Sequence, residues 1–225
     1  MQLVVKEFQE RVAEIEGYLD FVRTVSQGST QLRRASDNTP AYTAASQDDL
    51  LRTFKASALL MLYNLMESSV KNSVESIFDE LEKQTVSFDG CREEIRLVVL
   101  GNMRQHSPPN LLSMLNVLAT DVVTKTFRKA DIFSGNIDAR EIKGVARRYG
   151  FSEPKSRGDR LLTVKTHRND LAHGSKSFAE VGRSFSIEDI IQIKQDVVDY
   201  LREMLDNVTS YLDEKSYLLI PATSL

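Results

Sequence analysis

The sequence predicts an all-α protein, folded as an antiparallel helical bundle. Apolar residues recur at spacings of three and four over long stretches, which is the periodicity of amphipathic helices, whereas strands would show alternation. Ten glycines and five prolines are few for 225 residues, which disfavours a turn-rich β-sandwich. We therefore expect one helical domain at 1–215, with a short helical module inserted at 132–160 and a C-terminal tail at 216–225.

The N-terminal part predicts a long helix followed by a loop. Residues 26–46 are polar and small and contain Pro40, so we expect a loop there. Because this loop has no apolar stripe to anchor it, we also expect it to be flexible. The helix before it carries a stripe of six apolar residues: Val5, Phe8, Val12, Ile15, Leu19 and Val22.

Three helices are predicted in the middle of the chain. Ser46 and Asp49 form a capping-box pattern, after which an apolar stripe continues to about residue 85. A shorter helix is expected at about 91–105 and another at about 110–130. The first of the three is the longest, and we expect it to form the centre of the core.

The inserted module predicts a short helix with recognisable ends. Asp138 is expected to cap a helix at 139–149, and Gly150 suits the left-handed position that follows a helix. Residues 152–159 are then expected to form a basic loop.

Two further helices complete the predicted bundle. The first runs over about 159–173 and stops at Gly174. The second is long and amphipathic, with Ser186 as its cap and an apolar stripe that extends to Leu212.

The composition is that of an ordinary globular protein, with 41% hydrophobic and 27% charged residues. The only cysteine, Cys91, excludes an intrachain disulfide and any Cys-based zinc site within one chain. No run approaches the roughly 20 apolar residues of a membrane helix, and charged residues near the N-terminus disfavour a signal peptide. We expect a cytoplasmic protein with no membrane partner, no metal and no cofactor.

Charge is unevenly distributed along the chain. The net charge is −3, but residues 125–183 carry +7 and the remainder carries −10. A basic segment on an acidic body is typical of a protein with an anionic partner such as RNA, although an unequally charged, solvated surface would give the same count. The candidate RNA-binding residues are Arg147, Arg148, Lys155, Arg157, Arg160 and Lys165.

One segment is a candidate active site. The glycine-rich, P-loop, HExxH and GxSxG signatures are missing. What remains is Arg168-Asn169-Asp-Leu-Ala-His173, followed by Gly174 and a long amphipathic helix.

This segment resembles the motif of the HEPN superfamily, a group of helical bundles. That motif is an arginine, a polar residue and then a histidine after four to six intervening residues. Arg160 and His167 also satisfy the bare spacing, but only the Arg168–His173 segment has the asparagine, the Leu-Ala pair and the following glycine. We expect His167 to be a solvated neighbour.

Other stretches are similar to one branch of the superfamily, the stand-alone bacterial HEPN proteins predicted to be nucleases. They are residues 12–19, 62–67 and 135–150, and the resemblance covers about residues 3–212. It implies a HEPN-type bundle that acts as a metal-independent endoribonuclease of the toxin or antiviral-defence kind. An antitoxin or another defence-operon protein is then a candidate partner. The resemblance also implies that a polar residue of the second helix, Glu67, faces the site.

Helical geometry indicates how such a site would be completed. At about 100° per residue, Asn169 and His173 share a helical face, whereas Arg168 and His173 lie about 140° apart. Either the long Arg168 side chain wraps around the helix, or a two-fold homodimer completes the pair, as the family resemblance implies.

The residue types fit RNA cleavage. Histidine can take the proton from a ribose 2′-OH, and arginine donates several hydrogen bonds to a phosphate. We therefore assign proton transfer to His173, phosphate binding to Arg168 and orientation of the imidazole to Asn169. Because the 2′-OH is already held beside the phosphorus, no metal is required.

Other interpretations remain open at this point. Arg168 and His173 could be ordinary residues that bind the last carbonyls of a helix, and Glu67 could lie exposed at the polar edge of its helix. The protein could instead be a HEPN module that binds RNA or nucleotide without cleavage, or a dimerisation scaffold for a partner. It could also be a helical adaptor with no small ligand.

Overall fold

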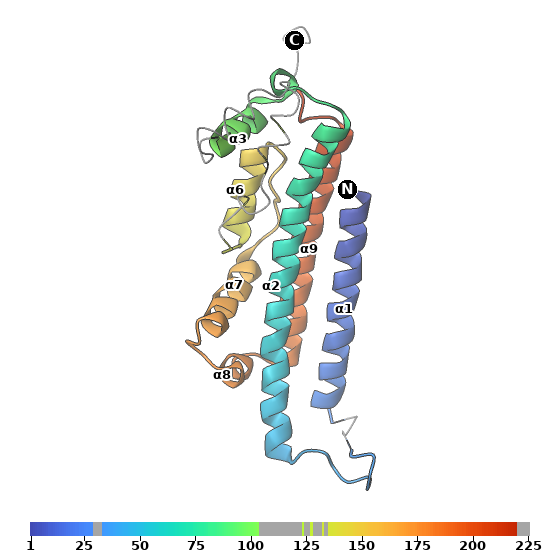
Figure 1. Cartoon of the computed structure of the whole chain (residues 1–225). Helices are drawn as coiled ribbons and strands as arrows, with labels where there is room; N and C mark the ends of the chain where they lie inside the picture. The colour runs from blue at the N-terminus through green and yellow to red at the C-terminus, as the bar shows by residue number, and fades with distance from the viewer. Residues whose placement is uncertain (29–32, 104–122, 124–126, 128–131, 133–134, 220–225) are drawn as a thin grey trace. The chain divides into compact units, whose positions relative to one another are not determined.

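The computed structural model describes residues 1–28, 33–103, 123, 127, 132 and 135–219, and this part of the chain is helical (Figure 1). It contains a 3-10 helix at Phe88–Gly90 and isolated bridges but no strand. The predicted all-α class is confirmed. The α-helices are α1 (Gln2–Ser26), α2 (Ala44–Lys83), α3 (Glu93–Met103), α6 (Ala139–Tyr149), α7 (Asp159–Ala172), α8 (Phe178–Arg183) and α9 (Ile187–Asp213).

The predicted helix at about 110–130 lies outside the described residues, except for two isolated positions. Over the residues that are described, no helix has the length and apolar character needed to span a membrane.

The chain divides into two compact units. The α7 unit comprises Lys6–Met66 and Arg157–Tyr200. The α6 unit comprises Met1–Val5, Glu67–Ser156 and Leu201–Leu225. Helices α1, α2 and α9 contribute residues to both.

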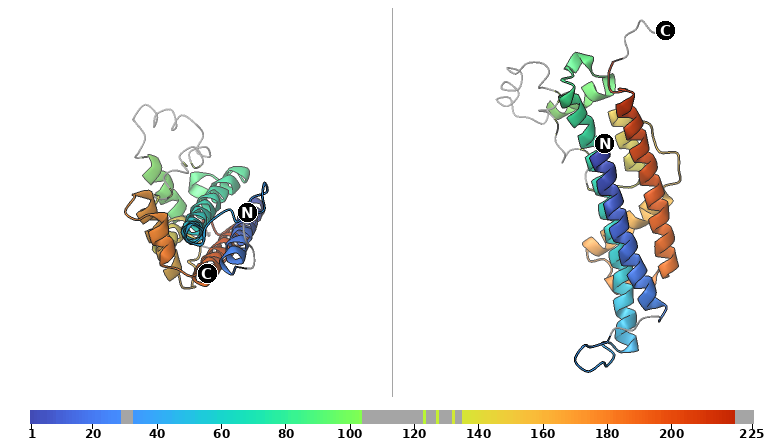
Figure 2. Two further views of the ribbon diagram at one scale, coloured as in Figure 1. Left: turned by 90° about the horizontal axis from the view of Figure 1, so that it is seen from below. Right: turned by 90° about the vertical axis from the view of Figure 1, so that its right-hand side faces the viewer.

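In the α7 unit, α1 runs in the opposite direction to α2 and lies beside α2 and α9 (Figures 1 and 2). Its buried residues are those of the predicted stripe from Phe8 onward, and the stripe continues to Val25. The Tyr18 hydroxyl donates to the backbone oxygen of Phe54 at 2.9 Å. On the other side, Lys194 of α9 donates to Glu16 at 2.9 Å. Apolar packing therefore holds α1 in place, and polar contacts border it.

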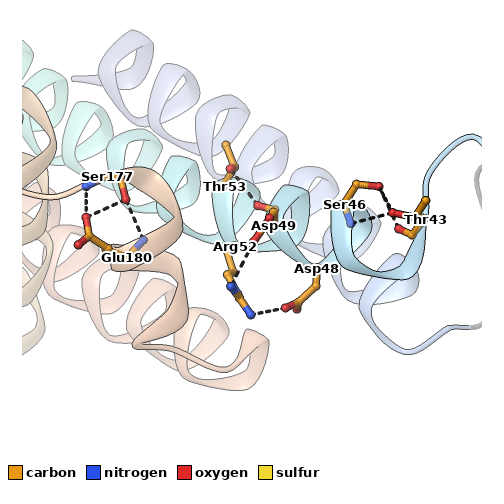
Figure 3. A network of polar contacts seen from close by, with 8 residues as sticks. All are labelled: Thr43, Ser46, Asp48, Asp49, Arg52, Thr53, Ser177 and Glu180. Atoms are coloured by element: carbon orange, nitrogen blue, oxygen red, sulfur yellow. Dashed lines mark hydrogen bonds and ion pairs between the residues drawn. The ribbon is translucent and has the colours of Figure 1, made fainter.

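The start of α2 differs from the prediction. Thr43, and not Ser46, receives a backbone N–H, because the Ser46 N–H donates to the Thr43 hydroxyl at 3.3 Å (Figure 3). The helix therefore begins at Ala44, two residues before the predicted cap. Asp49 instead pairs with Arg52, which also contacts Asp48.

Helix α8, which no sequence pattern had predicted, packs closely against α2 within the α7 unit. A Cβ at Gly182 would lie 1.9 Å from the backbone oxygen of Arg52, so only glycine permits this approach. Just after α8, the backbone oxygen of Phe185 accepts a 2.6 Å hydrogen bond from Lys55 of α2. Ser177 and Glu180 form a capping box at the start of α8 (Figure 3).

The α6 unit confirms the predicted ends of its short helix. The Asp138 side chain accepts the Glu141 N–H at 2.9 Å, and Gly150 has the left-handed φ of 84°. The Tyr211 hydroxyl of α9 donates to the Tyr149 oxygen at 2.8 Å. Arg92 donates to the Gly150 oxygen at 2.8 Å, so the turn after α6 is held from two sides.

The start of the predicted C-terminal tail is packed within the α6 unit. Tyr217 is buried, its backbone oxygen accepts the Arg92 N–H at 2.9 Å, and the Leu219 N–H donates to the Gly90 oxygen at 2.9 Å. Cys91 is buried between these contacts, and burial raises the pKa of its thiol to about 11.

Candidate functional site

Helix α7 carries the candidate motif, and its burial pattern sets the direction of each motif residue. Leu161 and Val164 are fully buried, whereas Leu162 is 54% exposed. Arg168 follows Leu161 by seven residues, which places it on the buried face of the helix. His173 follows Leu162 by eleven residues, which places it on the exposed face.

The Arg168 side chain is half-buried and held by two groups of the α7 unit. Its guanidinium carbon lies 4.4 Å from the ring centroid of Tyr63 in α2. Its Nη1 donates to Oδ1 of Asn169 at 3.0 Å. Both partners are uncharged, so neither of them offsets the positive charge of the guanidinium.

Asn169 therefore contacts the motif arginine. The prediction assigned it to the imidazole of His173, whose backbone N–H donates to the Asn169 backbone oxygen at 3.0 Å. Orientation of the imidazole by Asn169 remains a prediction.

His173 ends α7 with an exposed side chain. Gly174 follows with a φ of 68°, as expected for a residue that stops a helix. The backbone oxygen of Asp170 accepts the N–H groups of Ser175 and Lys176 at 2.9 and 3.3 Å. The Asp170 carboxylate also accepts from Lys176 Nζ at 2.7 Å, so the turn next to His173 is fixed by hydrogen bonds.

One chain presents the arginine and the histidine in different directions. Arg168 contacts Tyr63, while His173 lies exposed about 140° around the helix and about 7.5 Å along its axis. The single chain therefore holds the guanidinium against Tyr63 and leaves the imidazole accessible, and it directs the two groups to different sides of the helix.

His167 is a packed residue, and its prediction as a solvated neighbour is wrong. Its ring meets that of Phe185 edge-on at 5.1 Å between centroids. Nδ1 is buried, lies 3.6 Å from Asp170 Oδ2, and makes no hydrogen bond among the described residues. Burial lowers the pKa of His167, the charge of Lys176 lowers it further, and Asp170 opposes both. The alternative arginine, Arg160, approaches Asp196 of α9 at 3.6 Å.

Glu67 lies in the α6 unit, where it accepts from Lys71 of the same helix at 2.6 Å. Its side chain is 26% exposed. The Glu67 carboxylate is thus engaged by Lys71. Contact between Glu67 and the motif remains a prediction.

The six predicted RNA-binding residues divide equally between the units. In the α6 unit, Arg147 pairs with Glu153 at 2.7 Å, and Arg148 donates to the backbone oxygen of Ile132 at 2.8 Å. Lys155 is exposed in the same unit. In the α7 unit, Arg157 and Arg160 are exposed, and Lys165 is half-buried on the motif helix itself.

Comparison with known families gives a match over nearly the whole chain. The sequence model described as HEPN_MAE_28990-like HEPN matches residues 2–217, which includes the motif and residues of both units. The comparisons with curated proteins and with solved structures give no match.

Proposed function

Because the chain belongs to the HEPN_MAE_28990-like HEPN family, we propose that it is a metal-independent endoribonuclease of the toxin or defence kind. The observation that supports catalysis most directly is the state of the motif: a guanidinium positioned by neutral partners and an exposed imidazole on the same helix. The toxin or defence role comes from the family resemblance, with an antitoxin or defence-operon protein as the expected partner.

The proposed reaction is an internal transesterification. His173 takes the proton of a ribose 2′-OH, and the 2′-oxygen then attacks the adjacent phosphorus. The 5′-oxygen of the next nucleotide leaves and takes a proton from a second histidine. Arg168 donates to the phosphate oxygens, on which negative charge develops. The products are a 2′,3′-cyclic phosphate and a 5′-hydroxyl.

The second histidine would come from a second copy of the chain. On α7, Leu162, Asn169 and His173 lie within about 40° of one another around the helix axis. Leu162 is an exposed apolar residue on this otherwise polar stripe. Pairing of two copies through this face would bury Leu162 and bring both His173 side chains together.

The decisive experiment is incubation of total and transfer RNA with the purified protein in EDTA. Wild type should cut the RNA, and His173→Ala should not. Ser175→Ala, an exposed change two residues away, serves as the matched control and should cut normally. RNA that is bound by wild type but left intact would favour the binding-module interpretation.

A further inference from the structure

Tyr63 is a buried aromatic residue beneath the motif arginine, and sequence patterns assign it no role. It is 1% exposed and lies in α2, far from Arg168 in the chain. The 4.4 Å separation between the guanidinium carbon and the ring centroid is well within the roughly 6 Å range of cation–π attraction. Burial strengthens this attraction, because water competes less for the charge.

The surroundings of Arg168 differ from those of two other arginines in the α7 unit. Arg52 is paired with Asp48 and Asp49, and Arg160 approaches Asp196. Among the described residues, Arg168 is paired with no carboxylate: it contacts a ring face and one amide oxygen. A carboxylate would neutralise the guanidinium and occupy two of its donors. An aromatic ring instead fixes the plane of the guanidinium. The N–H donors lie in that plane and point away from the guanidinium carbon, so the ring does not occupy them.

We propose that Tyr63 is a positioning residue for Arg168, whose ring holds the guanidinium plane in place for an RNA phosphate while preserving its positive charge. This inference rests on the proposed function, since it assigns Arg168 to the phosphate. Simple core packing is the alternative, because a buried ring also contributes apolar contact area to α2.

Four variants of the full chain separate these roles. Tyr63→Phe keeps the ring face, whereas Tyr63→Leu keeps apolar bulk and removes the π system. Arg168→Ala and the Tyr63→Leu/Arg168→Ala double variant complete a cycle. Thermal unfolding of each variant shows that it is folded before kcat and KM for RNA are measured.

We expect Tyr63→Phe to retain the wild-type kcat and Tyr63→Leu to lose about tenfold, the rate equivalent of a partly desolvated cation–π contact. In the Arg168→Ala background, Tyr63→Leu should cause no further loss, because its effect acts through Arg168. Equal kcat values for the Phe and Leu variants, or additive losses in the cycle, would overturn the proposal.

Two further measurements keep this test separate from the proposed function. The first is the affinity for a 2′-O-methyl RNA, which has no free 2′-OH and cannot be cut. Measured for wild type, both single variants and the double variant, it tests the coupling of Tyr63 and Arg168 without cleavage. The Arg168 Nε–H resonance should be shifted upfield by the ring in wild type and Tyr63→Phe, and not in Tyr63→Leu. If wild type cuts no RNA, the proposed function fails, and the binding cycle still decides the role of Tyr63.

Discussion

At the scale of single residues, His173 and Arg168 should fail in different ways. His173→Ala should reduce RNA cleavage by about 10²–10⁴-fold, the usual contribution of a general base, and should leave RNA binding intact. Arg168→Ala should weaken both, because the guanidinium also binds the phosphate in the ground state. Cleavage rates in EDTA and filter binding of 2′-O-methyl RNA measure the two effects. Full activity of His173→Ala, or strict dependence on magnesium, would contradict the mechanism.

His167 gives a prediction for stability and pH. Because burial lowers its pKa in the folded chain, the unfolded chain binds a proton more readily once the pH falls below about 6.5. The contribution of neutral His167 to the free energy of unfolding is therefore complete above that pH and is lost as the pH falls toward the lower folded pKa. Urea unfolding measures the free energy of unfolding at neutral and at mildly acidic pH. Between these two values it should fall less for His167→Gln than for wild type. An equal loss in both proteins would be inconsistent with this cause.

The limits of sequence prediction are clearest at this scale. The Arg168–His173 motif could be found because its residues are neighbours in the chain. The contact between Arg168 and Tyr63 could not, since Tyr63 lies in a different helix and in an apolar stripe that gives no sign of a charged partner. The burial of His167 was missed for the same reason, because Phe185 comes from beyond α8.

At the scale of helices, the features that could be predicted are those set by residues close together in the chain. The caps of α6 were found because Asp138 and Gly150 act on backbone within a few residues. Helix α8 was missed because its six residues are too few for a recognisable apolar period. The predicted cap at Ser46 was wrong because Thr43 also suits a cap, and only the backbone geometry distinguishes the two residues.

Gly182→Ala tests the close approach of α8 to α2. Its added Cβ would overlap the Arg52 backbone oxygen, so we expect the free energy of unfolding to fall by about 1–3 kcal/mol. Gly17→Ala in α1 is the matched control, since no atom lies within 4 Å of its added Cβ. That change should stabilise by about 0.5–1 kcal/mol, as helix interiors favour alanine. Chemical denaturation measures both, and unchanged stability of Gly182→Ala would show that α8 is readily displaced.

At the scale of the whole molecule, the basic residues predict salt-dependent RNA binding. Replacing Arg157, Arg160 and Lys165 with glutamine should reduce the slope of log K against log salt by about two, if all three contact phosphates of single-stranded RNA. Arg147→Gln/Lys155→Gln tests the α6 unit in the same way. Affinity that is unchanged between about 50 and 200 mM salt would mean that the basic segment is only a solvated surface.

The proposed pairing of two copies can be measured directly. Leu162→Glu places a charge on the exposed stripe of α7 and should shift the protein from dimer to monomer in light scattering over a dilution series. Leu97→Glu in α3, at a residue that is 60% exposed, is the matched control and should leave the mass unchanged. A wild-type monomer at every concentration would exclude the dimeric site.

The different directions of Arg168 and His173 on α7 also have a consequence for kinetic order. If each working cleft combines groups from two chains, the activity per chain should rise with protein concentration and vanish on dilution, as mass action requires. Mixing Arg168→Ala and His173→Ala proteins should restore no activity, because a mixed pair holds only one His173 and the proposed reaction uses two. The cell could in that case restrain the enzyme simply by keeping it scarce.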